Sequence, residues 1–132
     1  MATDFLSNKA SDVYRLAKSK TILTPAAATY RLIRIPKWSM VTDLWVWVQT
    51  AGSTKTVSFG WLGNGETAQT SGFMSLDFAD VTLTGMKRAT RDNFQSYEGK
   101  YFNAASGMIT MTVGTTQTTG AFHVFVEYVV IL

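Results

Sequence analysis

The end of the sequence alternates with a period of two, and this period restricts the chain to an extended conformation there. Every second residue from Phe122 to Leu132 is large and apolar, and the residues between them include His123 and Glu127. Successive side chains of a β-strand point to opposite faces of its sheet. The alternation therefore predicts a strand over 121–132 whose even-numbered residues face the core.

Residues 41–50 repeat this pattern in the middle of the chain. One face of the expected strand holds Leu44, Val46 and Val48, and the other holds Trp45 and Trp47. A strand with apolar side chains on both faces is usually buried on both faces in the folded and assembled protein. We place the aliphatic face in the core, so the two tryptophans point away from it.

Shorter strand patterns, separated by turns, occupy much of the remaining chain. We expect these further strands at 29–35, 56–61, 73–84, 100–104 and 108–113. Between them we expect a polar loop from Gly63 to about Gly72, an irregular charged segment over 85–99 and a threonine-rich loop over 114–120. Roughly seven or eight short strands at this spacing predict an all-β fold, a β-sandwich of jelly-roll type.

The first 27 residues lack these strand patterns, so we divide the chain into an N-terminal basic arm and linker at 1–27 and one β-sandwich domain at 28–132. Within the arm, Asn8 or Ser11 is placed to cap a short helix. That helix would carry Val13, Leu16 and Ala17 on one side. Because so short a helix is unstable alone, we expect the arm to order mainly on contact with a partner.

Positive charge is concentrated near the N-terminus. Seven of the 12 basic residues, but only two of the nine acidic ones, lie in the first 37 positions. A basic arm on a mildly acidic body favours an anionic partner, although a solubilising terminus explains the same charge. The candidate docking residues of the arm are Lys9, Arg15, Lys18 and Lys20.

The sequence lacks the usual motifs of catalytic and metal sites. Without cysteine it has no disulfides, thiolate metal ligands or cysteine nucleophiles. The one histidine, His123, shares a strand face with Glu127, but four residues of strand separate them by roughly 13 Å. Asp77 and Asp80 are not embedded in the alternating oxygen donors of a calcium loop. We therefore expect no enzymatic activity, no metal and no other cofactor.

The sequence also bears on membranes and on nucleic acid. No apolar run is long enough to span a bilayer, and the first 20 residues lack the apolar core of a signal peptide, so we expect synthesis in a cytoplasm. Tyr14 and Tyr30 are interleaved with the basic residues, a pattern that can bind phosphates and stack bases. We consider a nucleic-acid-binding module an alternative, but no nucleic-acid motif accompanies the charge.

Trp45 and Trp47 are the candidate oligomer interface. Two adjacent indoles on one strand face form an apolar patch that is unusual when left in water. Another subunit can cover them, and so can the arm or the segment 62–99 of the same chain. In a domain of this size we favour the subunit.

Several short blocks in the body, taken in order, resemble a known group of proteins. These blocks are YRLIRIP at 30–36, TDLWVWV at 42–48, VSFGWLG at 57–63, SGFM at 71–74 and GKYFNAASGMITMTV at 99–113. Together with the apolar final strand, they resemble small structural proteins of tailed double-stranded DNA phages. Some members of that group are head decoration, or cement, proteins. The resemblance covers residues 28–132.

This resemblance implies a structural protein of the phage head without enzymatic activity or cofactor. It implies a decoration protein that binds the major capsid protein, stabilises the shell and assembles as a homotrimer. The protein would then be located in the virion after synthesis in the host cytoplasm. A tail or head–tail connector protein is the alternative within the same class.

Overall fold

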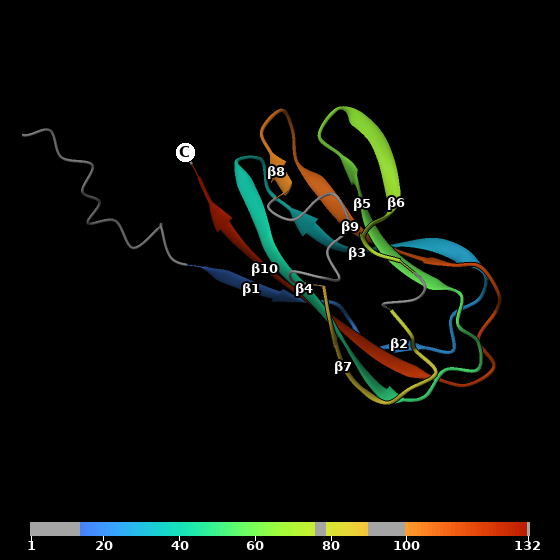
Figure 1. Cartoon of the computed structure of the whole chain (residues 1–132). Helices are drawn as coiled ribbons and strands as arrows, with labels where there is room; N and C mark the ends of the chain where they lie inside the picture. Colours follow the sequence, from blue (N-terminus) through green and yellow to red (C-terminus); the bar gives the residue numbers. More distant parts are fainter. Residues whose placement is uncertain (1–13, 76–78, 90–99, 132) are drawn as a thin grey trace, which may run out of the picture.

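The computed structural model describes residues 14–75, 79–89 and 100–131. These residues form ten β-strands and no helix, arranged as two antiparallel sheets that lie face to face (Figure 1). The predicted all-β sandwich is therefore confirmed.

The first sheet, sheet A, is built around its two longest strands. β10 (Ala121–Val130) pairs with β4 (Ser39–Thr50) along its whole length. The far edge of β10 pairs with β1 (Arg15–Lys18) and then β2 (Ile22–Leu23), and the far edge of β4 pairs with β7 (Gly85–Arg88) and β8 (Lys100–Phe102). The long patterns at 41–50 and 121–132 thus mark the centre of the sheet.

Four strands make up sheet B. They are β3 (Ala28–Ile35), β9 (Gly107–Val113), β5 (Val57–Gly63) and β6 (Glu66–Met74), in that spatial order. β3 ends directly before Pro36, as expected for a residue that cannot donate to a ladder. Along the sequence, the chain passes back and forth between the two sheets several times.

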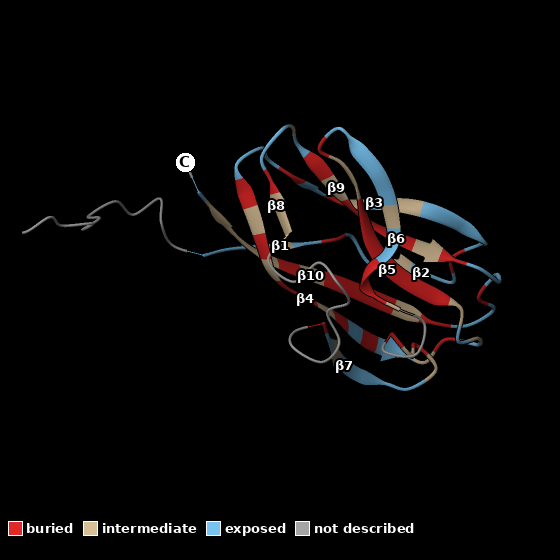
Figure 2. Cartoon of the chain, turned by 45° about the horizontal axis from the view of Figure 1, so that its top comes forward, coloured by how far each residue is buried: buried red, intermediate tan, exposed pale blue. Residues whose placement is uncertain are grey.

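The core lies between the sheets, where buried residues gather on the facing sides of both (Figure 2). Sheet A contributes the predicted faces of its two central strands, and sheet B contributes larger side chains. The main contributors are Leu44, Val46, Val48, Phe122, Val124 and Val126 from sheet A, and Phe59, Trp61, Ile109 and Met111 from sheet B. The predicted inward face of each central strand is confirmed.

The polar loop predicted from Gly63 to Gly72 is wrong, because most of it is strand β6. Asn64 and Gly65 have φ angles of 58° and 68°, which Asn-Gly readily adopts, and they close a two-residue hairpin. β6 is an edge strand whose first half faces solvent, so no apolar alternation marks it. The predicted strand at 73–84 is also largely wrong, because β6 ends at Met74 and residues 79–84 form turns.

The irregular segment predicted over 85–99 begins instead with strand β7, and residues 90–99 lie outside the described ranges. The short helix predicted for the arm is also wrong within the described residues. Arg15 to Lys18 form strand β1, in register with Tyr128 to Phe125 of β10. The open edge of β10 offers unpaired backbone groups, and pairing with them overrides a weak helical pattern.

The described part of the arm packs on the body. Ala17 and Ile22 lie against the core, and Ser19 is almost fully buried between β1 and β2. The backbone N–H of Ser19 donates to the Val124 carbonyl at 2.8 Å, and its Oγ accepts from the Val124 N–H at 3.1 Å. Residues 15–23 are therefore part of sheet A. We had expected the arm to order mainly on contact with a partner, but this part of it is ordered by contact with its own chain.

One buried polar residue, through its side chain and its backbone N–H, joins three loops at one end of the sandwich. Gln117 Oε1 accepts hydrogen bonds from the N–H groups of Ser53 at 2.8 Å and Thr54 at 3.1 Å, and its Nε2 donates to the Thr54 carbonyl at 2.9 Å. The Gln117 N–H donates to the Pro25 carbonyl at 2.9 Å. This glutamine therefore fixes the β4–β5 loop, the β9–β10 loop and the arm linker relative to one another.

We predict that Gln117→Ala lowers the free energy of unfolding by about 2 kcal/mol or more, because two backbone N–H groups lose their acceptor in a buried place. Chemical denaturation followed by tryptophan fluorescence measures this. Thr118→Ala, next to it and exposed, is the control and should change stability by less than about 0.5 kcal/mol. Equal small losses in both variants would contradict a structural role for Gln117.

Candidate assembly surface

Trp45 and Trp47 lie on the outer face of sheet A, as predicted, and each stacks on its neighbour across β10. Trp45 lies opposite Phe125 in the register, with ring centroids 5.5 Å apart. Trp47 lies opposite His123, with centroids 4.8 Å apart. The four rings form two adjacent stacked pairs across the centre of the sheet. Such pairs stabilise cross-strand contacts beyond the area that they bury.

Strand β7 extends these pairs with a cation. Arg88 lies opposite Trp45 in the register, and its Cζ is 5.3 Å from the centroid of the indole. The same guanidinium reaches the buried carboxylate of Asp43, with its Nη2 2.7 Å and its Nε 2.9 Å from Oδ2. Asp43 Oδ1 accepts the Leu44 N–H at 2.8 Å. Arg88 is thereby held over Trp45, and its charge is offset by the Asp43 carboxylate.

His123 is a structural residue of the patch rather than half of an acid–base pair. Its Nε2 lies 3.0 Å from Oε1 of Gln49, and its ring is covered by Trp47. Glu127 instead accepts a hydrogen bond from the Thr42 hydroxyl at 2.9 Å. Burial, and to a smaller extent the charge of Lys18, lowers the pKa of His123, so its imidazole is neutral at physiological pH.

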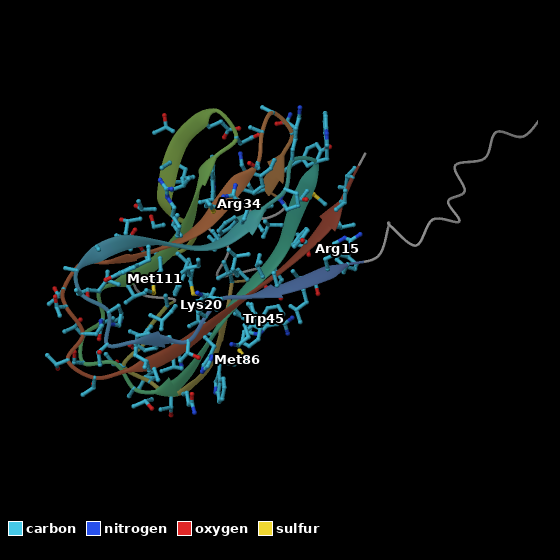
Figure 3. The ribbon with its side chains drawn as sticks, turned by 180° about the vertical axis from the view of Figure 1, so that it is seen from behind. Arg15, Lys20, Arg34, Trp45, Met86 and Met111 are labelled. Carbon is cyan, nitrogen blue, oxygen red and sulfur yellow. The ribbon has the colours of Figure 1, made fainter. Side chains whose placement is uncertain are left out.

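The patch is only partly covered by the described residues. Trp47 is 39% exposed, and Met86, its register partner on β7, is more exposed still. Trp45 is half-buried and, with Met86 and Arg88, lines a shallow hollow of about 210 Å³. Figure 3 shows Trp45 and Met86 together on this face. An exposed indole and thioether beside a fixed guanidinium have the composition of a protein contact surface, in which aromatic, methionine and arginine side chains are enriched.

The candidate docking cations lie along the edge of sheet A formed by the arm. Arg15, Lys18 and Lys20 are exposed on β1 and just after it, and Lys9 lies outside the described residues. Lys18 lies opposite Phe125 in the register, so this cation extends one of the aromatic pairs on the side away from Arg88. Its Nζ also donates to the Ser19 carbonyl at 3.2 Å. Among these cations, Lys18 is therefore a neighbour of the aromatic patch on the same face of sheet A.

Asp80, one of the two aspartates considered as metal ligands, is engaged in a turn. Asp80 Oδ1 accepts hydrogen bonds from the backbone and hydroxyl of Thr82, which closes a turn and lowers the Asp80 pKa. Asp77 lies outside the described residues. Within the described ranges, His, Asp and Glu side chains nowhere gather in threes. Those ranges also contain no helix with the length and hydropathy needed to span a lipid bilayer.

The fold is similar to chains in two solved phage capsid structures. One is the acidic stable capsid structure of Helicobacter pylori bacteriophage KHP30, with a TM-score of 0.60 and 17% identity over 88% of this chain and 86% of that chain. Another is the cyanophage Pam1 capsid asymmetric unit, with a TM-score of 0.63 and 13% identity over 97% of this chain and 92% of that chain. At such identities the likeness is one of fold. No protein-family model and no curated protein matches the sequence.

The alternation pattern located the tryptophans on the outer face but missed their partners on β7. Met86 and Arg88 fall in a segment that was predicted to be irregular, and the strand that holds them is only four residues long. The buried carboxylate of Asp43, which precedes the apolar run of β4, was the available signal, because a buried carboxylate requires a cationic or hydrogen-bonding partner.

The lowered pKa of His123 makes stability depend on pH just below 6.5, the ordinary value for histidine. There the unfolded chain binds a proton that the folded protein does not, so the free energy of unfolding falls as the pH falls. We predict a lower Tm at about pH 5.5 than at about pH 7.5, and a smaller difference for His123→Gln, which does not titrate. Glu66 and Asp80 also have lowered pKa values, but the stability that these carboxylates contribute is lost only when the pH falls below their ordinary pKa values of 4.5 and 3.8. Equal differences in both proteins would remove His123 as the cause.

Proposed function

We propose that this protein is a structural component of a phage virion that binds the head shell as a decoration, or cement, protein. The observation that carries the proposal is the match in fold to chains from two phage capsid structures, with nearly complete coverage in both directions. Coverage of this kind means that the matched chains are similar to this one in length as well as in fold. Both structures are named for capsids, which supports the head over the tail.

The strand order supports the jelly-roll part of the prediction. If β1 and β2 share one position in sheet A, and β7 and β8 share another, each sheet has four positions. Along the chain, strands one, eight, three and six then form sheet A, and strands two, seven, four and five form sheet B. This alternation of distant strands is what two Greek keys folded over each other produce. Jelly rolls recur in viral capsid proteins.

We propose that the aromatic patch is the contact between copies in a homotrimer. Its support is the exposed side chains of Trp47 and Met86 beside the half-buried Trp45. A closed trimer places one patch against a different surface of the next copy, so that each copy covers its neighbour. Burying an indole that is stacked on one side and open on the other gains apolar area without ordering a flexible side chain.

We propose that the arm edge, with Arg15, Lys18 and Lys20, binds the major capsid protein. Its support is three exposed cations on and just after β1, a strand whose outer edge has no partner among the described residues. The role that we propose for this contact is mechanical. Bridging adjacent shell subunits would oppose the internal pressure of the packaged DNA.

The direct test adds the purified protein to heads assembled without it and measures co-sedimentation and the temperature at which the heads release DNA. We expect saturable binding and a raised release temperature, because a ligand that binds only the intact shell stabilises it. Protein that stays in the supernatant, or that binds isolated tails instead, would contradict the decoration role.

We predict that Trp47→Ser weakens self-association by about 2 kcal/mol or more, since large aromatic side chains near an interface centre dominate its energy. Sedimentation equilibrium measures the change. Trp47 is the better choice because it is exposed, whereas Trp45 is half-buried between Phe125 and Arg88 of its own chain. Trp38→Ser is a matched control, because Trp38 is 40% exposed and lies before β4, away from the patch. Equal effects of both changes, or of neither, would contradict the assignment of the interface.

A further inference from the structure

A second hollow lies where the arm passes along strand β3 of the other sheet. Its volume is about 290 Å³, and it is lined by Ser19, Lys20, Thr21, Ile22, Arg31 and Leu32. The first four residues connect and begin the arm strands of sheet A, and the last two belong to β3 at the edge of sheet B. The hollow therefore spans the seam between the sheets, and it exists only because the arm is folded onto the body.

Both walls of this hollow are fixed by the backbone. Ser19 bonds to Val124 of β10 through its N–H and its Oγ, and its Oγ also donates to the Lys20 carbonyl at 2.9 Å. Arg31 lies opposite Thr110 of β9, and the register shifts at Leu32 directly after it. This bulge turns Leu32 toward the core, where it packs. The bases of the two cationic side chains are thus held in place.

Charge in the hollow is one-sided. Lys20 and Arg31 are both exposed, and neither forms an ion pair or hydrogen bond through its side chain with the described residues. Among the residues that the structure describes, no acidic side chain lines the hollow. In contrast, Arg88 pairs with Asp43, and Lys100 pairs with Glu66 at 2.8 Å. Two cations that share a small hollow repel each other, and an anion placed between them relieves that repulsion.

The other side chains that line the hollow favour one class of anion over another. Ile22 and Leu32 supply aliphatic surface next to the cations, and Thr21 supplies a hydroxyl. A carboxylate on a short aliphatic stem matches this mixture, and arginine binds carboxylates in two-point geometry. The described lining holds no aromatic side chain that could stack a nucleotide base, the feature that single-stranded nucleic acid sites share.

We propose that this hollow binds a carboxylate side chain from an acidic segment of a partner protein, with Lys20 and Arg31 as the two cations that hold it. This inference deepens the proposed docking role of the arm and rests on that role only for the identity of the partner, the shell subunit. The sequence assigned Lys20 to the arm and Arg31 to the body, and the fold brings them to one site.

The test uses the full chain and two blocked hexapeptides, one of alternating leucine and glutamate and one with glutamine in place of glutamate. Amide chemical shifts of the ¹⁵N-labelled protein are followed during titration at low salt. We expect the glutamate peptide to shift the amides of residues 19–22 and 31–32, with at least about tenfold weaker binding of the glutamine peptide because the charge-assisted contacts are lost. Raising the salt should weaken the binding, since these contacts are exposed to solvent.

The double variant Lys20→Gln/Arg31→Gln should lose the binding, while Lys55→Gln/Lys87→Gln should keep it. The second pair removes the same charge from around Asp80, so it controls for net charge. Shifts spread over all basic residues, or equal losses in the two double variants, would overturn the site. Tighter binding of a single-stranded DNA oligonucleotide at the same amides would overturn the choice of a carboxylate.

This experiment needs no phage heads, so its failure and the failure of the decoration role are distinguishable. If the protein sediments with heads but does not bind the glutamate peptide, the proposed function stands and the carboxylate site is refuted. A protein that binds the peptide at residues 19–22 and 31–32 but does not bind heads keeps the carboxylate site and loses the shell as its partner.

Discussion

Strands β4 and β10 form the longest ladder of sheet A, with register shifts only near the two ends of β10, and both the core and the outer surface depend on this ladder. On its inner face the pairing brings Val46 against Val124 in the centre of the sandwich. On its outer face the same register brings Trp45 against Phe125. A slip of one residue would exchange these faces and put indoles in the core. The register that buries the aliphatic side chains therefore also builds the aromatic surface.

The two edges of this ladder are completed in different ways. On the β10 side, the N-terminal segment supplies β1 and β2, and buried Ser19 keeps the hydrogen bonding continuous across the break between them. On the β4 side, β7 brings Arg88 to the buried Asp43. An unpaired edge exposes donors and acceptors to other chains. By folding the basic arm onto this edge, the protein replaces an aggregation-prone edge with a charged one.

Sequence patterns predicted the strands that have one buried face and failed for those that do not. The strands at 41–50 and 121–132 were evident because every second side chain over 44–48 and 122–126 is in the core. β6 was read as a loop because its first half is exposed on both faces, and β1 was read as a helix because Leu16 and Ala17 fit either period. Contacts made by single polar side chains, such as those of Gln117, leave no periodic pattern. The sequence also gives no sign that Lys20 and Arg31 line one hollow, because this depends on where the arm packs.

On the proposed function, the aromatic patch and the basic edge of sheet A have separate physical tasks. Charged groups exposed at a rim act over about 8 to 10 Å at physiological salt, so they mainly speed and orient the encounter with an acidic surface. Apolar side chains act only in contact, and burying them mainly slows dissociation. In a trimer, three copies of a weak carboxylate contact would engage one shell together. Linked sites that bind at the same time reach a much higher overall affinity than one site alone, if their spacing matches that of the target sites. Rigid placement of Lys20 and Arg31 by the sheets, rather than by a flexible tail, is what such matching requires.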